Sequence, residues 1–264
     1  MHSQPLFIVG APRSGTTFLC HTLNQHACIH LTNESRIFVL LKDLLENKKK
    51  SAGLIGRDFY GPFVDFLYRQ AGELVERFYR EGLGISAAIW GDKHPPYADP
   101  CVLSGRTGAD PRIPLSGSCL RLIRDSLPAA KFIHIHRNPV EVARSLVHKG
   151  WTPSFAGGIS VWHQYVTEIV EFFGELDPAR HLSIAYRDLL EMPAEICALL
   201  GRFLGLEEWA TIEEFLLRQR QRPIPFSDPV TDLREVYRSR RDRNGDPPAP
   251  APVGETAARL GYCS

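Results

Sequence analysis

The stretch that decides the fold is residues 6–17, which read Leu6-Phe7-Ile8-Val9-Gly10-Ala11-Pro12-Arg13-Ser14-Gly15-Thr16-Thr17. Residues 6–9 form a short apolar run that favours β-structure, and Gly10 ends it. From residue 16 to residue 25, apolar side chains recur at helical spacing. The pattern predicts a strand, a glycine-containing loop and a helix.

The loop has the spacing of a phosphate-binding loop, but Thr16 occupies the position at which a nucleoside triphosphatase carries lysine. Backbone N–H groups at the start of a helix hold a phosphate without that lysine, with the helix dipole behind them. The donors expected here belong to Arg13, Ser14, Gly15, Thr16 and Thr17, and Arg13 adds a guanidinium that can bind an anion through two hydrogen bonds. The alternative interpretation is a tight turn that needs its glycines only for backbone freedom. A loop of this composition directly after a strand favours anion binding.

Beyond the loop, patterns typical of helices alternate with patterns typical of strands. Helices are predicted at 35–46, 63–78, 140–148 and 193–204, residues 162–173 carry one apolar helical face, and strands are predicted at 88–90, 131–136 and 182–186. Such alternation predicts parallel pairing, helices on both faces of the sheet and ligand loops at the carboxyl ends of the strands. We therefore expect an α/β fold in which residues 1–264 form a single domain around a central parallel sheet flanked by helices.

Two segments differ from the rest in composition. Residues 95–118 are crowded with Pro, Gly and Ser, which predicts a surface insertion that acts as an active-site lid. Residues 218–250 are rich in Arg, Asp and Pro and hold few apolar anchors, which predicts an extended segment laid over the domain.

The bulk composition excludes several classes of partner. Lysine and arginine number 31 against 30 acidic residues, so there is no general positive field to attract nucleic acid. The 6 cysteines form no CxxC pair and no cluster with histidine, so no metal site is expected. No basic and apolar N-terminal run is long enough for a signal peptide or a membrane span. These features predict a soluble, cytoplasmic protein without a membrane span.

Two motifs together suggest a family. PRSGTT at 12–17 follows FIVG, and HRNPVEVARS at 136–145 follows a predicted strand. The pair resembles the cofactor motifs of sulfotransferases that use 3'-phosphoadenosine 5'-phosphosulfate (PAPS), which have a P-loop nucleotide-binding fold. The resemblance implies that the first motif holds the 5'-phosphosulfate and that Arg137 and Ser145 hold the 3'-phosphate. It also places Tyr186, in YRDL, close to the cofactor, although a buried core tyrosine is the alternative.

The residues support the second motif independently. Arg137 lies at the predicted end of a strand and Ser145 lies on the adjoining helix, so a guanidinium and a hydroxyl can converge on one phosphate. Taken alone, Arg137 would be interpreted as a surface ion pair and Ser145 as a helix-surface hydroxyl.

The acceptor side resembles the tyrosylprotein sulfotransferase branch. Glu34 and Arg36, at the predicted start of the second helix, match the E-x-R segment that supplies the catalytic glutamate there, and Lys93 in GDKHP matches the lysine brought to the sulfuryl group. The resemblance implies that Glu34 is the general base, whereas Glu34 as a helix cap is the alternative. His94 is the competing base, because cytosolic small-molecule sulfotransferases use a histidine shortly after a lysine.

The C-terminal segment matches the family only in part. Residues 251–262 resemble the closing helix of the family, and Ser227 and Ser239 are candidates for C-terminal cofactor contacts. The acceptor could be a small molecule, a sugar, a lipid or a peptide.

The predicted function is in-line transfer of a sulfuryl group from PAPS to a hydroxyl acceptor, with Glu34 as base, Arg13 and Lys93 stabilising charge, and no metal. A P-loop kinase or nucleoside triphosphatase is the alternative enzyme, but it needs a strand-borne aspartate for magnesium, and none follows the strands near residues 9, 135 and 185. A nucleotide-binding domain without activity is the third possibility, against which Glu34 and Lys93 argue.

Overall fold

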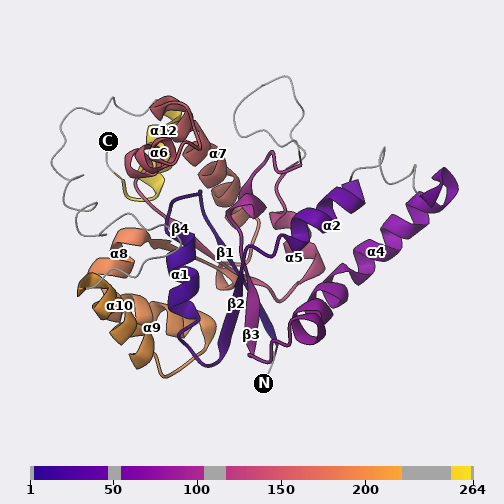
Figure 1. The fold of residues 1–264 in the computed structure, drawn as a ribbon, viewed down its shortest axis with the longest axis horizontal. Coiled ribbons are helices and arrows are strands. Elements are labelled where there is room, and N and C mark those ends of the chain that lie inside the picture. Colours follow the sequence, from indigo (N-terminus) through magenta and orange to yellow (C-terminus); the bar gives the residue numbers. More distant parts are fainter. Residues whose placement is uncertain (1–2, 47–54, 104–116, 222–250, 263–264) are drawn as a thin grey trace.

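The computed structural model describes residues 3–46, 55–103, 117–221 and 251–262 (Figure 1). Within these ranges, the strands form a five-stranded sheet in the order β2-β3-β1-β4-β5, and every pairing is parallel. The strands are β1 (Gln4–Val9), β2 (Ile29–Asn33), β3 (Ile89–Lys93), β4 (Lys131–His136) and β5 (His181–Ala185). The predicted α/β class with a central parallel sheet is confirmed.

Helices cover both faces of the sheet because the side chains of the central strand alternate between two apolar cores. Leu6 and Ile8 belong to the core under α1 (Thr16–Leu23), α8 (Tyr186–Glu191), α9 (Pro193–Leu204) and α10 (Ala210–Gln221). Phe7 and Val9 belong to the core on the opposite face, which is built with α2 (Ile37–Glu46), α4 (Arg57–Arg77), α5 (Leu120–Ser126), α6 (Pro139–His148), α7 (Phe155–Gly174) and α12 (Ala251–Arg259). Three short turns complete the described elements: η1 (Phe78–Gly82), a π-helix, and the 3₁₀ turns η2 (Pro95–Ala98) and η3 (Pro178–Arg180).

The second strand-loop-helix unit forms as its sequence predicts. Strand β4 occupies residues 131–136, and α6 begins with Pro139 at its first position, where its missing N–H costs no hydrogen bond. The side-chain Oδ1 of Asn138 caps the helix by accepting from the N–H of Val140 at 2.9 Å.

Within the residues that the structure describes, the local structure differs from the prediction in three places. Residues 29–33 form strand β2, where no strand was predicted, and α2 begins at Ile37 rather than at residue 35. The first part of the proposed lid, Pro95 to Leu103, is mostly buried against the core and is not a surface insertion; residues 104–116 lie outside the described ranges. Residues 218–221 are the end of α10 rather than extended chain, and residues 222–250, with Ser227 and Ser239, also lie outside the described ranges.

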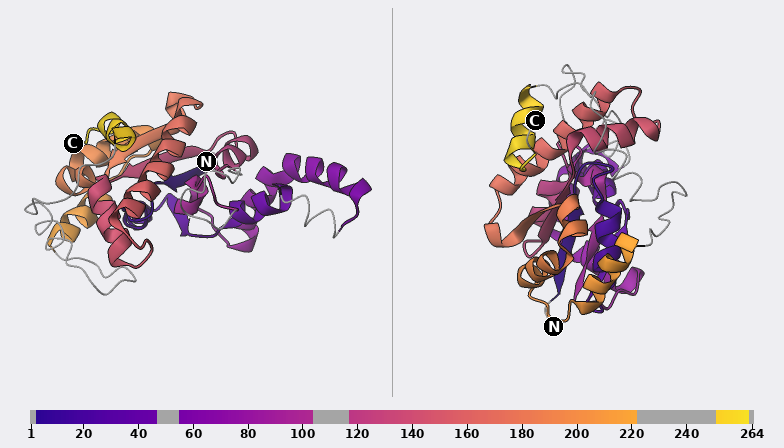
Figure 2. Two further views of the ribbon diagram at one scale, coloured as in Figure 1. Left: turned by 90° about the horizontal axis from the view of Figure 1, so that it is seen from above. Right: turned by 90° about the vertical axis from the view of Figure 1, so that its left-hand side faces the viewer.

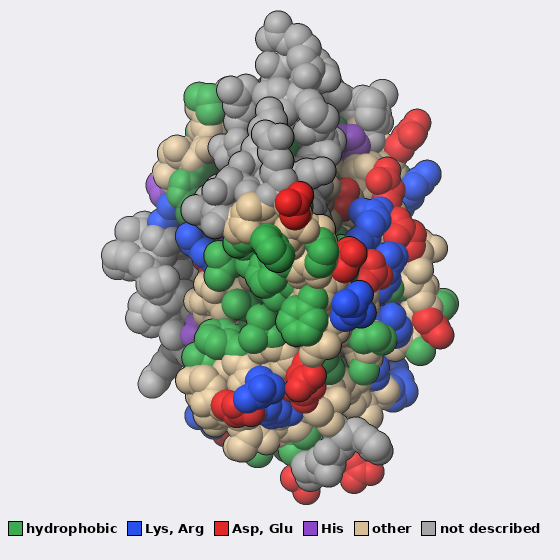
Figure 3. All heavy atoms as spheres, turned by 90° about the vertical axis from the view of Figure 1, so that its right-hand side faces the viewer, with side chains coloured by type: hydrophobic (Ala, Val, Ile, Leu, Met, Phe, Trp, Pro, Cys, Tyr) green, Lys and Arg blue, Asp and Glu red, His purple; other side chains and the backbone are tan. Residues whose placement is uncertain are grey.

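Helix α4 is the most projecting element, and Figure 2 shows it extending away from the sheet. It begins at Arg57 and continues past Pro62, so it starts earlier than the helix predicted at 63–78. The face of the molecule from which it projects carries a cluster of apolar side chains (Figure 3). The exposed large apolar side chains of α2 and α4 are Leu40, Phe59, Phe63, Phe66, Tyr68 and Leu74. In the described part of the chain, α2 and α4 therefore present an exposed apolar surface.

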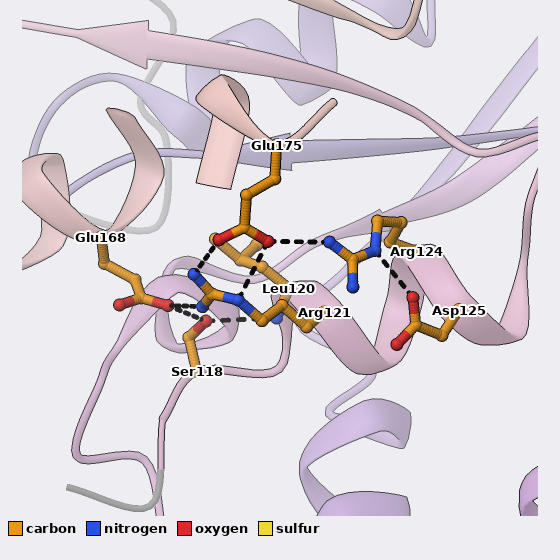
Figure 4. Close-up of polar contacts among 7 residues, drawn as sticks. All are labelled: Ser118, Leu120, Arg121, Arg124, Asp125, Glu168 and Glu175. Atoms are coloured by element: carbon orange, nitrogen blue, oxygen red, sulfur yellow. Dashed lines mark hydrogen bonds and ion pairs between the residues drawn. The ribbon is translucent and has the colours of Figure 1, made fainter. Parts of the chain in front are cut away.

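Helices α5 and α7 are joined by an ion-pair network (Figure 4). Arg121 pairs with Glu168 at 2.9 Å and also with Glu175, which in turn accepts from Arg124 at 2.8 Å. Ser118 donates to Glu168 at 2.6 Å, which fixes the entry to α5 on α7. These charges are partly exposed, so each pair contributes about 0–1 kcal/mol to the contact between α5 and the C-terminal part of α7.

No helix in the described ranges combines the length and the apolar character needed to cross a membrane.

Candidate active site

Each of the five strands delivers a predicted site segment at its carboxyl end. The phosphate loop follows β1, Glu34 follows β2, Lys93 ends β3, Arg137 follows β4 and Tyr186 follows β5. Parallel strands bring these ends to one edge of the sheet, which is where ligands bind in open α/β folds. In the register of the sheet, Lys93 pairs with Ile8 of β1 and with Asn33 of β2.

The phosphate loop turns through two residues with left-handed backbone, of which only Gly15 adopts this conformation without strain. Arg13 and Gly15 both have left-handed conformations, with φ of 72° and 98°. A Cβ on Gly15 would lie 2.3 Å from Cδ2 of Tyr186, so the tyrosine ring packs directly on the glycine. Ser14 is fully buried, and its Oγ has no hydrogen-bond partner in the described residues. A buried hydroxyl in this state is suited to bind a ligand oxygen.

The two predicted cofactor motifs meet through Arg13. Its Nε donates to Oγ of Ser145 at 3.1 Å, although the residues are 132 positions apart. Its guanidinium also lies 5.6 Å from the ring centroid of Trp151, a side chain that is 59% exposed. Trp151 belongs to no recognised motif, so the sequence analysis did not identify it as a site residue.

Arg137 and Tyr186 form the other half of this cluster. Arg137 donates to Glu141 at 2.6 Å, and its guanidinium lies 4.8 Å from the centroid of the Tyr186 ring. The backbone carbonyl of Arg137 accepts from Nε1 of Trp162 at 2.9 Å, which anchors the strand end. Tyr186 is buried and contacts both motifs, so its two sequence interpretations, core residue and neighbour of the cofactor site, are compatible.

Glu34 and Lys93 form an ion pair at the carboxyl ends of β2 and β3. Nζ of Lys93 lies 2.8 Å from Oε1 of Glu34; the lysine side chain is 1% exposed and the glutamate side chain 41%. Ser35 and Arg36 separate Glu34 from Ile37, the first residue of α2, so Glu34 does not occupy the capping position of this helix. Burial alone would raise the pKa of Glu34, but the hydrogen bond and charge of Lys93, followed by His94 and Arg36, lower it below its ordinary value. Glu34 is therefore a carboxylate near neutral pH.

The charge of Lys93 also reaches the helix that follows the phosphate loop. The pKa of His21, on α1, is lowered by partial burial and by Lys93. The Glu34–Lys93 ion pair thus lies close enough to α1, the helix that follows the phosphate loop, to act on it electrostatically.

His94, the competing base, has a different environment. It is 3% exposed, its Nδ1 has no partner in the described residues, and its ring lies 4.8 Å from that of Tyr97. Burial lowers its pKa to about 4, so the imidazole is neutral and weakly basic at neutral pH. Arg36, the second residue of the E-x-R match, is exposed and has a left-handed φ of 61°.

One strand carries an aspartate that the sequence analysis did not place on a strand. Asp92 lies within β3, beyond the predicted end of that strand, and is fully buried. Its carboxylate accepts hydrogen bonds from Thr32, Ser35 and Tyr97, so it is already occupied by protein donors rather than directed at a magnesium position. In the part of the chain that the structure describes, no group of three or more His, Cys, Asp and Glu side chains could hold a metal ion.

Comparison with known proteins identifies a family and a fold. A family model described as the sulfotransferase family matches residues 5–211. An uncharacterised protein of Aquifex aeolicus (strain VF5) is 23% identical over 245 residues, which are 89% of this chain and 30% of that protein. The chain therefore spans less than a third of the length of this relative.

Two solved structures share the fold. The sulfotransferase domain from the curacin biosynthetic pathway matches with a TM-score of 0.66 at 18% identity over 98% of each chain. The sulfotransferase domain from the Synechococcus PCC 7002 olefin synthase matches with a TM-score of 0.67 at 16% identity, over 99% of this chain and 95% of that one.

Proposed function

Because the chain belongs to the sulfotransferase family, we propose that it transfers a sulfuryl group from PAPS to a hydroxyl acceptor, with Glu34 as general base. The observation that carries the proposal is the hydrogen bond between Arg13 and Ser145, which joins the phosphate loop to the second motif at the edge of the sheet. A phosphate loop without its lysine, joined to an Arg137 and Ser145 cluster, suits a nucleotide with phosphates at two positions better than a nucleoside triphosphate.

The residues present fit PAPS. The buried Oγ of Ser14, the amides of residues 13–17 and the Arg13 guanidinium would hold the 5'-phosphosulfate. Arg137 and Ser145 would hold the 3'-phosphate, with the ring of Tyr186 beside them. When bound, PAPS supplies an activated sulfuryl group with a phosphate as its leaving group.

Different residues of the chain perform proton transfer, positioning and charge stabilisation. Glu34 accepts the proton of the acceptor hydroxyl, for which its lowered pKa keeps it ionised near neutral pH. Lys93 orients Glu34 through the 2.8 Å ion pair and adds positive charge on the acceptor side. Arg13 and the loop amides stabilise negative charge that develops on the phosphate side, which is worth about 3 kcal/mol of barrier for one well-placed donor.

Calorimetry with adenosine 3',5'-bisphosphate and adenosine 5'-monophosphate tests the donor assignment. Loss of the 3'-phosphate should weaken binding about 10- to 100-fold, because hydrogen bonds to charged groups are worth about 1.5–3 kcal/mol. Arg137→Ala should remove this discrimination. Arg202→Ala is the matched control, because Arg202 is an exposed arginine at the amino ends of the strands, away from the candidate site. It lies on α9 next to Phe203, whose carbonyl accepts from Lys131, the first residue of β4. Equal affinity of the wild-type chain for the two nucleotides would contradict the assignment.

Sulfate transfer itself is tested with PAPS labelled in its sulfuryl group and a mixed library of hydroxyl acceptors. Sulfated products detected by mass spectrometry are the expected result. Hydrolysis of ATP with magnesium in place of sulfate transfer would contradict the proposal.

A further inference from the structure

A buried hydrogen-bond network surrounds the backbone that carries Glu34, and Asp92 is its centre. Oδ1 of Asp92 accepts from Oγ1 of Thr32 at 2.7 Å, and Oδ2 accepts from Oγ of Ser35 and from the hydroxyl of Tyr97, both at 2.8 Å. The backbone N–H of Ser35 also donates to this carboxylate, at 3.1 Å. The carboxylate thus holds the residues before and after the Asn33-Glu34 pair.

A second hydroxyl closes the network from another element. The hydroxyl of Tyr79 lies 3.1 Å from Oγ1 of Thr32 and 3.1 Å from Oγ of Ser35. Tyr79 is fully buried in the π-helical turn η1 that ends α4, and such turns often occur at functional sites. Burial and then the charge of Asp92 raise the pKa of both Tyr79 and Tyr97, so the phenols remain proton donors.

The backbone at Glu34 needs this support. Glu34 has φ of 69°, a left-handed conformation that is unfavourable for a residue with a Cβ. The conformation aligns the N–H of Glu34 with the carbonyl of Lys93, at 2.8 Å, while the side chain meets Nζ of the same lysine. A strained residue with two bonds to one partner is stable only where the surrounding structure holds it.

We propose that Asp92 is a positioning residue that fixes Glu34 against Lys93, and that its carboxylate is required for turnover although it touches no substrate. The proposal rests on the proposed function only where it concerns turnover. Its structural part, that Asp92 holds the 32–35 backbone, is independent of the reaction.

Asp92→Asn is the test, because it keeps the shape of the side chain and replaces one acceptor oxygen by a donor. The matched control is Asp99→Asn. Asp99 is also buried, and it accepts from the hydroxyl of Tyr165 at 3.1 Å and from the N–H of Cys101 at 2.8 Å, but none of its hydrogen bonds reaches residues 32–35. If Asp92→Asn fails to fold, Tyr97→Phe removes one donor to the same carboxylate and replaces it in both measurements.

The first measurement is amide hydrogen exchange of the segment that contains Glu34 and Ser35. Asp92→Asn should speed exchange of these amides by about 10-fold or more, since a hydrogen bond to a charged group is lost, and Asp99→Asn should not. Unchanged exchange in Asp92→Asn, or the same acceleration in Asp99→Asn, would overturn the proposal whether or not the chain transfers sulfate.

The second measurement separates turnover from nucleotide binding. In Asp92→Asn, kcat should fall by about 10²-fold, as expected for a small misplacement of a catalytic group, while KM for PAPS and the affinity for adenosine 3',5'-bisphosphate stay within about twofold. A parallel loss of donor affinity, or an equal loss of kcat in Asp99→Asn, would mean a general structural role and would overturn the proposal. Absence of sulfate transfer by the wild-type chain would instead reject the proposed function, and hydrogen exchange would then decide the role of Asp92.

Discussion

Replacing Glu34 by glutamine removes the proposed base and little else. Glutamine keeps the length of the side chain and an Oε1 that can accept from Lys93, but it cannot take the proton of a hydroxyl group. A positioned general base contributes about 10²–10⁴-fold to the rate, so kcat should fall by that factor, or about 3–5 kcal/mol of barrier. Affinity for adenosine 3',5'-bisphosphate should stay nearly constant, because Glu34 follows β2, at the opposite end of the sheet from β4 and β5, which lead to Arg137 and Tyr186.

The loss of activity can be separated from a loss of stability. Lys93 is almost fully buried, and after the substitution its ammonium donates to a neutral amide instead of a carboxylate. The cost should stay below about 2 kcal/mol, which shifts Tm by about 2–4 °C per kcal/mol in a chain of this size. Calorimetry and steady-state kinetics on the same preparation therefore distinguish an inactive folded variant from an unfolded one.

His94→Ala is the matched comparison. With a pKa of about 4, the imidazole is a weak base, so its removal should cost clearly less turnover than Glu34→Gln. If His94→Ala costs more, the reasoning is refuted and the base is His94. That outcome would also move the resemblance from the tyrosylprotein branch toward the small-molecule branch.

Three further predictions test the geometry of the site. Gly15→Ala places a Cβ 2.3 Å from Tyr186 and should weaken binding of adenosine 3',5'-bisphosphate by at least about 10-fold, whereas Gly205→Ala, with a similarly left-handed backbone but no neighbour within 4 Å, should not; calorimetry that finds equal affinity for both variants refutes the packing argument. The ring of Trp151 lies 5.6 Å from the guanidinium of Arg13 and is largely exposed, so the bisphosphate should change the tryptophan emission; a Trp151→Phe variant with the same response would show that another tryptophan reports binding. Burial lowers the pKa of His136 from an ordinary 6.5 to about 4. The contribution of His136 to the free energy of unfolding is therefore complete above pH 6.5 and falls by about 3 kcal/mol as the pH approaches 4. In urea unfolding, the stability of His136→Phe should decrease less over this range than that of the wild type, and an unchanged pH profile would reject the prediction.

The parts of the fold with strong local signals could be predicted from the sequence. Strand β4 alternates cleanly, and Asn138 and Pro139 mark the start of the next helix, so both elements were placed correctly. Strand β2 was missed because only Ile29 and Leu31 point into the core on this short edge strand, too few to distinguish a strand from a loop.

Strand β3 was predicted to end too early because of one glycine. Gly91 looks like a strand breaker in the sequence, but a Cβ there would lie 1.9 Å from the carbonyl oxygen of Leu6, so the glycine allows close packing against β1 within the strand. The early end hid Asp92 as a strand residue and with it the network around Glu34.

The candidate site was predicted as a set of residues, whereas its pairings needed the structure. Motif spacing indicated Arg13, Arg137 and Ser145 separately, but the bond between Arg13 and Ser145 joins segments 132 residues apart. Trp151 has no local signal at all, because its relation to Arg13 exists only after the sheet has formed. The roles of the site residues and the cytoplasmic location stay predictions.

The strand order has a consequence for how the chain folds. Strand β1 pairs with β3 and β4, which lie far along the chain, and the site takes one segment from every strand up to β5. Contacts between distant segments form late, since loop closure must precede them. A nucleotide that needs both Arg13 and Tyr186 therefore meets a complete site only once the last strand has docked, and it should slow unfolding without speeding the folding step.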